Sequence, residues 1–321
     1  MVIWILLIIV GFALLIKGAD FLVDGASGIA KKFHIPEIVI GLTVVSIGTS
    51  MPELFVSITS AINGFADMAV GNVVGSNIAN LLLILGVASV IRPVRFKRET
   101  RLIEIPICLV ISIIFLAICN LGQGITKFEA FILMILFLCF IAYTIFMAKK
   151  GESFDKEDDG DTPEQENEKK PRKTIVNLVF LIIGIVMLKF GGDLTVNNAI
   201  NIAKHFNLSE KIISVTILAI GTSLPELVTS VSAAIKGKSD IAIGNILGSN
   251  VFNMLLIIGV SAAIRPIVYN LSYNVDMAFL IAATLVLSLF PVIPPKNTMS
   301  RVNGIIYVFM YIAYLVVLFI R

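Results

Sequence analysis

One pattern of residues occurs twice along this chain of 321 residues, and it constrains the fold more than any other feature. An offset of 173 positions places GNVVGSNIAN (71–80) over GNILGSNVFN (244–253), and Arg92-Pro93 over Arg265-Pro266. No gap is needed between about residue 11 and residue 93. A unit that recurs at a fixed spacing indicates a duplicated architecture.

Hydrophobicity is the second constraint. Hydrophobic residues make up 57% of the chain and charged residues 15%, whereas soluble domains are about half apolar and about a quarter charged. Apolar runs of about twenty residues, long enough to cross a bilayer as a helix, recur from end to end. The predicted fold class is therefore an all-α polytopic membrane protein. Ten transmembrane helices are expected, at 2–30, 35–62, 66–91, 102–120, 125–148, 174–203, 209–235, 239–264, 272–293 and 302–320.

Five of these spans fall in each copy of the repeat. The expected organisation is a five-helix repeat over 1–148, an acidic linker over 149–173 and a second five-helix repeat over 174–321. An odd number of spans makes the second copy enter the membrane from the opposite side, which predicts two inverted-topology repeats. This arrangement is typical of secondary transporters.

Positive charge predicts the orientation, since lysine and arginine accumulate in cytoplasmic loops. With the N-terminus outside, the inner loops hold 18 lysines and arginines and the outer segments hold 5. We therefore expect a multi-pass protein of the cell (plasma) membrane, with both termini outside and the linker in the cytoplasm.

Several other functional classes find little support. The net charge is only +3, and no basic patch with interleaved aromatic residues predicts a nucleic-acid partner. Cys108, Cys119 and Cys139 lie in apolar stretches without metal-ligand or redox spacing. His34 and His205 lie at span ends, without a serine or cysteine at a depth that would suit an intramembrane hydrolase. We expect no enzymatic activity and no cofactor.

The linker KKGESFDKEDDGDTPEQENEKKPRK (149–173) is the only long polar stretch, and its simplest interpretation is a solvated tether between the halves. A calcium-binding loop is the alternative. Glutamate at its third position, a proline inside it and the lack of flanking amphipathic helices argue against that alternative. The matching residues, at positions 1, 3, 5, 6 and 12 of the pattern, are Asp155, Glu157, Asp159, Gly160 and Glu166.

Two glutamates, Glu53 and Glu226, lie deep in predicted spans. A charge at the middle of a bilayer costs about 2.5–3.5 kcal/mol on insertion scales. No lysine, arginine or histidine occurs at membrane depth in the second, third, seventh or eighth span, so a buried basic partner does not explain them. Protonation or a bound cation remains.

The residues around Glu53 favour a cation. Pro52 has no N–H, so the carbonyl of Gly48 loses its helical partner and the helix kinks. Thr49 and Ser50 lie one turn before the glutamate on the same face. A carboxylate, two hydroxyls and freed carbonyls form an oxygen set that suits Ca²⁺ or Na⁺. The second copy repeats this set with Pro225, Gly221, Thr222, Ser223 and Glu226.

The second motif supplies further oxygen atoms. Asn72, Ser76 and Asn80 are spaced four residues apart and form one stripe of a helix. We expect its glycines to pack against neighbouring helices, and its serine and final asparagine to face the site. Asn77 points about 100° away from Ser76, so we interpret it as structural. The counterparts in the second copy are Asn245, Ser249, Asn253 and, for the structural position, Asn250.

The paired motifs GTSMPEL with GNVVGSNIAN, repeated as GTSLPEL with GNILGSNVFN, resemble the α-repeats of the cation/Ca²⁺ antiporter superfamily. The chain is most similar to the compact prokaryotic Na⁺/Ca²⁺ exchangers, and the resemblance covers all ten spans. It implies a fold of ten helices in which the second, third, seventh and eighth enclose the site. By this likeness, the long first and sixth helices slide across them.

The resemblance also implies a ligand set. Glu53 and Glu226 would be shared Ca²⁺ and Na⁺ ligands, and Asn80 and Asn253 would occupy the central positions. The carbonyls of Ser46 and Ala219 would complete Na⁺ sites. Further hydroxyl oxygens would come from Thr49, Ser50, Ser76, Thr222, Ser223 and Ser249.

The ions follow from charge and from the resemblance. Two carboxylates are balanced by one Ca²⁺ or by two Na⁺, so the two loads should compete. An aspartate at the position of Asn253 is tied to K⁺ use in the K⁺-dependent exchangers, so Asn253 argues against K⁺ cotransport. We expect a secondary-active antiporter that exchanges Na⁺ for Ca²⁺ by alternating access and functions as a monomer. Ca²⁺/H⁺ antiport and a passive cation channel are the alternatives.

Overall fold

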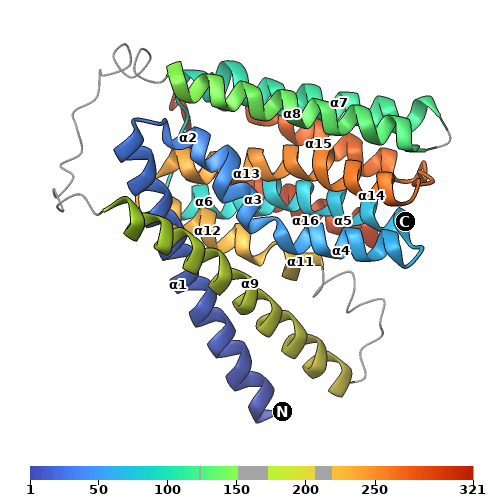
Figure 1. Cartoon of the computed structure of the whole chain (residues 1–321), viewed down its shortest axis with the longest axis horizontal. Helices are drawn as coiled ribbons and strands as arrows, with labels where there is room; N and C mark the ends of the chain where they lie inside the picture. Colours follow the sequence, from blue (N-terminus) through green and yellow to red (C-terminus); the bar gives the residue numbers. More distant parts are fainter. Residues whose placement is uncertain (123, 151–172, 207–218, 321) are drawn as a thin grey trace.

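The computed structural model describes residues 1–122, 124–150, 173–206 and 219–320 (Figure 1). Its first half contains α1 (Val2–Phe33), α2 (Glu37–Ile40), η1 (Gly41–Val45), α3 (Ser46–Thr49), α4 (Met51–Ile62), α5 (Ala66–Ile78), η2 (Ala79–Ile84), α6 (Leu85–Ile91), β1 (Val94–Arg95), η3 (Thr100–Glu104), α7 (Ile105–Leu121) and α8 (Lys127–Lys150), where η denotes a π-helix. The second half contains α9 (Thr174–His205), α11 (Ala219–Thr222), α12 (Leu224–Ile235), α13 (Ser239–Phe252), η5 (Asn253–Ile257), α14 (Ile258–Ile264), α15 (Tyr273–Leu289), β2 (Thr298–Met299) and α16 (Arg301–Ile320). The possible calcium-binding loop at 155–166 lies outside the described residues.

The helix boundaries repeat at the interval found in the sequence. α3, α4 and α6 begin and end 173 residues before α11, α12 and α14. Equal boundaries follow from equal breaks, because each copy carries proline, glycine and small polar residues at the same places.

Seven helices among the described residues are long and apolar enough to cross a membrane. The number is eight if Glu37–Thr49 and Met51–Ile62, which are bent by 49°, form one span. α12 and α15 are apolar but shorter. The expected span over 272–293 is too long, since α15 ends at Leu289 and a turn with Pro291 follows. Proline lacks the N–H that a continuing helix needs.

The helices differ in how deeply they lie within the protein. In the most apolar stretch of Ser239–Ile264, 94% of the residues are buried. The share is 72% in that of Met68–Ile91 and 22% in that of Lys127–Lys149. The outer helices instead expose large apolar side chains, among them Ile9, Leu138 and Phe309. An apolar exterior suits a protein surrounded by lipid. The two GN-x-x-GSN segments therefore occupy the centre of the bundle.

Short backbone contacts connect the halves outside the helices. β1 pairs with β2 in antiparallel register, Val94 with Met299 and Arg95 with Thr298. Ile125 and Ile267 exchange both backbone N–H···O bonds, at 2.8 and 3.0 Å. Each contact joins a loop of one repeat to a loop of the other.

Glycines allow α1 and α9 to pack closely at one side of the bundle (Figure 1). A Cβ atom on Gly184 would lie 2.6 Å from the backbone nitrogen of Leu22, and one on Gly18 would lie 2.9 Å from that of Leu188. A Cβ atom on Gly191 would lie 2.8 Å from the Gly11 carbonyl oxygen. The two backbones therefore touch, as small residues permit between membrane helices.

Three lysines form ion pairs between the repeats. Lys97 contacts Asp240 at 3.1 Å, and Lys238 contacts Glu37 at 3.1 Å. At the end of α12, Lys236 lies 3.1 Å from Asp20 and 2.7 Å from Asp24, both on α1. The residue that corresponds to Lys236 in the first copy is Asn63, so this contact is not repeated by symmetry.

Replacing this lysine, Lys236→Ala, should lower the apparent melting temperature of the purified protein. The change leaves two partly buried carboxylates on α1 without their shared cation. We expect a loss of about 1 kcal/mol, or about 2–4 °C, because the pairs are partly exposed to solvent. The control is Lys189→Ala, whose partner Asp193 lies one turn along the same helix. Equal melting temperatures for both variants at low salt would contradict the prediction.

Candidate cation site

Both GTS-x-PEL segments interrupt their helix at the serine of the motif. α3 ends at Thr49 and α4 begins at Met51, with Ser50 between them at φ −83° and ψ 9°. Ser223 takes the same place between α11 and α12, at φ −88° and ψ 8°. The following proline falls in the first turn of the new helix, where its missing N–H costs nothing. The structure therefore has the expected break in both copies.

Restarting the helix places each glutamate in a favourable position. Glu53 lies in the first turn of α4 and Glu226 in the first turn of α12. Unpaired N–H groups give the start of a helix a partial positive charge, which stabilises a nearby carboxylate. The proline thus opens the backbone and also sets the glutamate at the positive end of a helix.

Each carboxylate accepts a hydrogen bond from the other repeat. Ser50 Oγ lies 2.9 Å from Glu226 Oε1, and Ser223 Oγ lies 3.2 Å from Glu53 Oε1. Both glutamates are 1% exposed. Residues 173 positions apart in sequence are therefore parts of one buried site.

Five buried oxygen atoms of the predicted ligand set have no hydrogen-bond partner. They are Glu53 Oε2, Glu226 Oε2, Asn80 Oδ1, Asn253 Oδ1 and Thr222 Oγ1. Within the described ranges, neither glutamate forms an ion pair with a lysine, arginine or histidine. Buried polar oxygen without a partner costs free energy. Carboxylate, amide and hydroxyl oxygens together suit a hard cation.

Hydrogen bonds connect several other predicted ligands to this group. Thr49 Oγ1 donates to Asn245 Oδ1 at 2.9 Å, and Ser50 Oγ lies 2.9 Å from Ser249 Oγ. The carbonyl of Ser46 still accepts the backbone N–H of Ser50 at 3.0 Å. Two predicted ligands remain. Ser76 is 3% exposed, and Ala219 begins α11 directly after residues that lie outside the described ranges.

Sequence reasoning did not find two supporting serines. Asn72 donates to Ser57 Oγ at 3.1 Å and approaches the Glu53 carbonyl at 3.4 Å. In the second copy Asn245 donates to Ser230 Oγ at 2.9 Å. A serine four residues after each glutamate was the available signal, since i and i+4 share a helix face.

Sequence reasoning also missed a local change of helix type. A π-helical segment begins at Ala79 beside Asn80, and another begins at Asn253. Such turns are rare and often occur at functional sites. No residue type in either motif predicts these π-helical segments.

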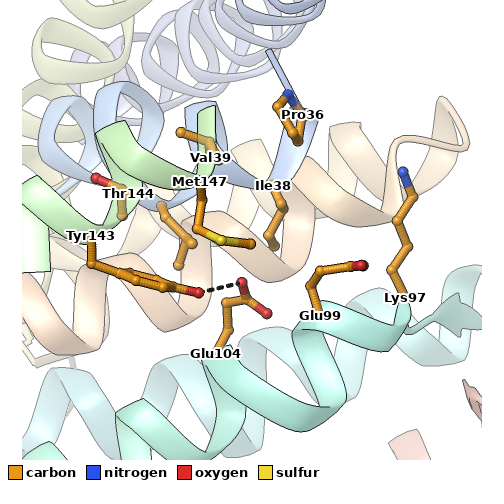
Figure 2. Close-up of a pocket in the computed structure, with 10 residues that line it drawn as sticks. Pro36, Ile38, Val39, Lys97, Glu99, Glu104, Tyr143, Thr144 and Met147 are labelled. Carbon is orange, nitrogen blue, oxygen red and sulfur yellow. Dashed lines mark hydrogen bonds between the residues drawn. The ribbon is translucent and has the colours of Figure 1, made fainter. Parts of the chain in front are cut away.

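A separate cavity lies between α2, η3 and α8 (Figure 2). In Figure 2, Tyr143 points toward Glu104, to which its hydroxyl donates at 3.3 Å. Glu104 is 4% exposed, and its Oε2 has no partner. The cavity contains none of the predicted ligands, so we place the candidate site at the paired glutamates, where both copies of the motif meet.

The sequence is similar over nearly its whole length to proteins that are named as antiporters or exchangers. The model of the family described as "Sodium/calcium exchanger protein" matches residues 3–146 and 176–320. The "Putative antiporter CaxA" of Alkalimonas amylolytica is 38% identical, and the match covers 97% of each chain. "Sodium/calcium exchanger MaX1" of Methanosarcina acetivorans is 32% identical, with 98% of each chain covered.

The fold agrees with a solved structure. The sodium-calcium exchanger NCX_Mj, soaked with Na⁺ and Ca²⁺, matches with a TM-score of 0.84 and 28% sequence identity, covering 98% of both chains. The family model, the similar sequences and the similar fold thus lead to the same conclusion. The chain belongs to the sodium/calcium exchanger family of membrane-embedded cation/Ca²⁺ antiporters.

Proposed function

We propose that this protein exchanges Na⁺ for Ca²⁺ by alternating access, through one shared site built around Glu53 and Glu226. The observation that carries the proposal is the reciprocal pair of serine–glutamate bonds, with one unpartnered oxygen left on each carboxylate. Those two oxygens come from opposite repeats. A cation between them would hold the two halves of the protein together.

Charge balance supports competition between the ions. Two carboxylates match one Ca²⁺ or two Na⁺, and the asparagines at the centre add oxygen without further charge. Either load would permit the halves to close, whereas an empty site with two negative charges would resist closure. A ligand that binds one state better shifts the population toward it. The named exchangers among the relatives, one of them soaked with Na⁺ and Ca²⁺ or Sr²⁺, support this choice of ions.

The proposed architecture is ten transmembrane helices in two inverted five-helix repeats, 1–148 and 174–321. Equal helix boundaries in the two halves support the duplication. With the N-terminus outside, lysine and arginine are in excess in the inner loops. This excess supports an orientation in which both termini lie outside and the linker lies in the cytoplasm. We propose that the monomer is the transporting unit, because both repeats of one chain supply the site.

Ca²⁺/H⁺ antiport is the alternative, since the unpartnered Oε2 of each glutamate is also able to hold a proton. Potassium is a third candidate counter-ion. Human "Sodium/potassium/calcium exchanger 3" is 29% identical over 46% of this chain and 23% of its own length. The neutral Asn253 is the feature that argues against K⁺.

Proteoliposomes distinguish these alternatives. Vesicles loaded with Na⁺, with H⁺ or with K⁺ would be diluted into medium that lacks the loaded ion and contains ⁴⁵Ca²⁺. We expect uptake only from the Na⁺-loaded vesicles, since outward Na⁺ flow drives Ca²⁺ inward. Uptake driven by the proton gradient alone would instead indicate Ca²⁺/H⁺ antiport. Uptake that needs no gradient, with single-channel steps in a planar bilayer, would indicate a channel.

A further inference from the structure

Two asparagines outside the predicted ligand set join the repeats at the centre of the bundle. Asn77 Nδ2 donates to the Asn250 carbonyl at 3.1 Å, and Asn250 Nδ2 donates to the Asn77 carbonyl at 3.2 Å. Both residues are 0% exposed. The bridge is reciprocal, since each side chain binds the backbone of its own counterpart.

The remaining oxygen of each bridging amide holds a central asparagine. Asn253 Nδ2 donates to Asn77 Oδ1 at 3.0 Å, and Asn80 Nδ2 donates to Asn250 Oδ1 at 3.0 Å. Asn80 and Asn253 are each 1% exposed. Four amides from two repeats therefore form one connected network.

The network fixes which way the central amides face. An amide carries its NH₂ donor and its oxygen acceptor on opposite sides. Because the NH₂ groups of Asn80 and Asn253 are bound by the bridge, their Oδ1 atoms must point elsewhere. Those two Oδ1 atoms are buried and have no partner.

We infer that Asn77 and Asn250 are positioning residues that present the amide oxygens of Asn253 and Asn80 to the cation site. The inference deepens the proposed function and rests on it. The bridge also selects the chemistry of the central positions. Because Asn77 Oδ1 only accepts, residue 253 must offer a donor toward it, and an ionised carboxylate has none. Asn77 and Asn250 thus specify neutral oxygen ligands at the centre.

A double-mutant cycle tests this assignment, with Ca²⁺ affinity of the purified, full-length protein measured calorimetrically in Na⁺-free buffer. We expect Asn77→Ala to weaken Ca²⁺ binding by about five- to tenfold, as for one lost orienting hydrogen bond. The same change made in an Asn253→Ala background should have little further effect, because Asn77 acts through Asn253. Coupling between the two sites is the quantity that the cycle isolates.

The matched control pairs Asn77→Ala with Asn80→Ala. Asn80 is held by Asn250, whose side chain binds the backbone carbonyl of residue 77, and alanine retains that carbonyl. These two effects should therefore combine additively. The symmetric cycle, Asn250→Ala with Asn80→Ala, repeats the test on the other copy. It replaces the first cycle if thermal melting shows that Asn77→Ala does not fold.

The outcomes separate the two hypotheses. Additive effects of Asn77→Ala and Asn253→Ala, with wild-type protein that binds Ca²⁺, would overturn the positioning role alone. Unchanged Ca²⁺ affinity in Asn77→Ala would do the same. Wild-type protein that binds no Ca²⁺ would overturn the proposed function together with the inference. Coupling in the matched pair and additivity in the control pair would support the assignment.

Discussion

Glutamine at either buried glutamate, Glu53→Gln or Glu226→Gln, should weaken Ca²⁺ binding by more than about a hundredfold and abolish exchange. Removing one partner of a buried charge pair costs about 3–5 kcal/mol, and about 1.4 kcal/mol corresponds to a factor of ten. One remaining carboxylate leaves the divalent cation half balanced. The measurement is ⁴⁵Ca²⁺ uptake by Na⁺-loaded proteoliposomes, together with calorimetric Ca²⁺ affinity.

Compared with the wild-type protein, the same variants should be more stable without Ca²⁺ and should gain no stability when Ca²⁺ is added. Without Ca²⁺ the substitution removes a buried and partly unpartnered charge, so the apparent melting temperature should rise. The increase that Ca²⁺ gives to the wild-type melting temperature should vanish, because a ligand stabilises only the state that binds it. A merely misfolded protein would also lose the Ca²⁺-dependent increase, but its melting temperature without Ca²⁺ would not rise.

The matched control is Glu104→Gln, in the cavity of Figure 2. Glu104 is also a buried glutamate with an unpartnered Oε2, but its partner is Tyr143 and it touches none of the predicted ligands. Glutamine keeps an oxygen that accepts the tyrosine hydroxyl. We expect exchange at the wild-type rate. Loss of exchange in Glu104→Gln equal to that in Glu53→Gln would show that burial of a carboxylate, and not its place in the shared site, decides the effect.

Alanine at Gly191 should destabilise the protein and reduce transport, whereas alanine at the neighbouring Gly192 should be tolerated. A Cβ on Gly191 would lie 2.8 Å from the Gly11 carbonyl oxygen and 2.9 Å from the Leu15 nitrogen, both on α1. A Cβ on Gly192 would come no nearer than 3.7 Å, to Pro225. Since backbone atoms cannot rotate away, α1 and α9 must separate in the first variant.

The expected cost of this separation is about 1–3 kcal/mol, as for overpacking elsewhere. Membrane helices depend on close packing, because the surrounding lipid is as apolar as their side chains. Thermal melting and Na⁺-driven ⁴⁵Ca²⁺ uptake of both variants, reconstituted at equal protein density, provide the measurement. Equal melting temperatures and equal transport rates for Gly191→Ala and Gly192→Ala would show that the close contact between α1 and α9 does not contribute to stability or transport.

Much of the fold was available from the sequence. The offset of 173 positions predicted equal helix breaks in both halves, and the boundaries of α4 and α12 agree with it. The hydrophobicity pattern predicts an end at residue 293, whereas α15 ends at Leu289, because the apolar run continues past the point where prolines stop the helix. Hydrophobicity records what lipid tolerates, whereas proline and backbone hydrogen bonding decide where a helix ends.

The sequence by itself determined the class of the protein and predicted the chemistry of its candidate site. Two glutamates in an apolar chain, each beside a proline and two hydroxyls, require a cation or a proton, because bare charge is costly in lipid. It also predicted that Asn77 lies off the ligand face, and that residue donates to a backbone carbonyl.

Only the tertiary structure decided how the two copies combine. Ser50 reaches the glutamate of the other repeat and not its own neighbour Glu53, and Asn253 is oriented by Asn77. These pairs are more than 170 residues apart, so no local spacing encodes them. They arise because the two repeats face each other, and buried polar groups must find partners wherever the packing places them.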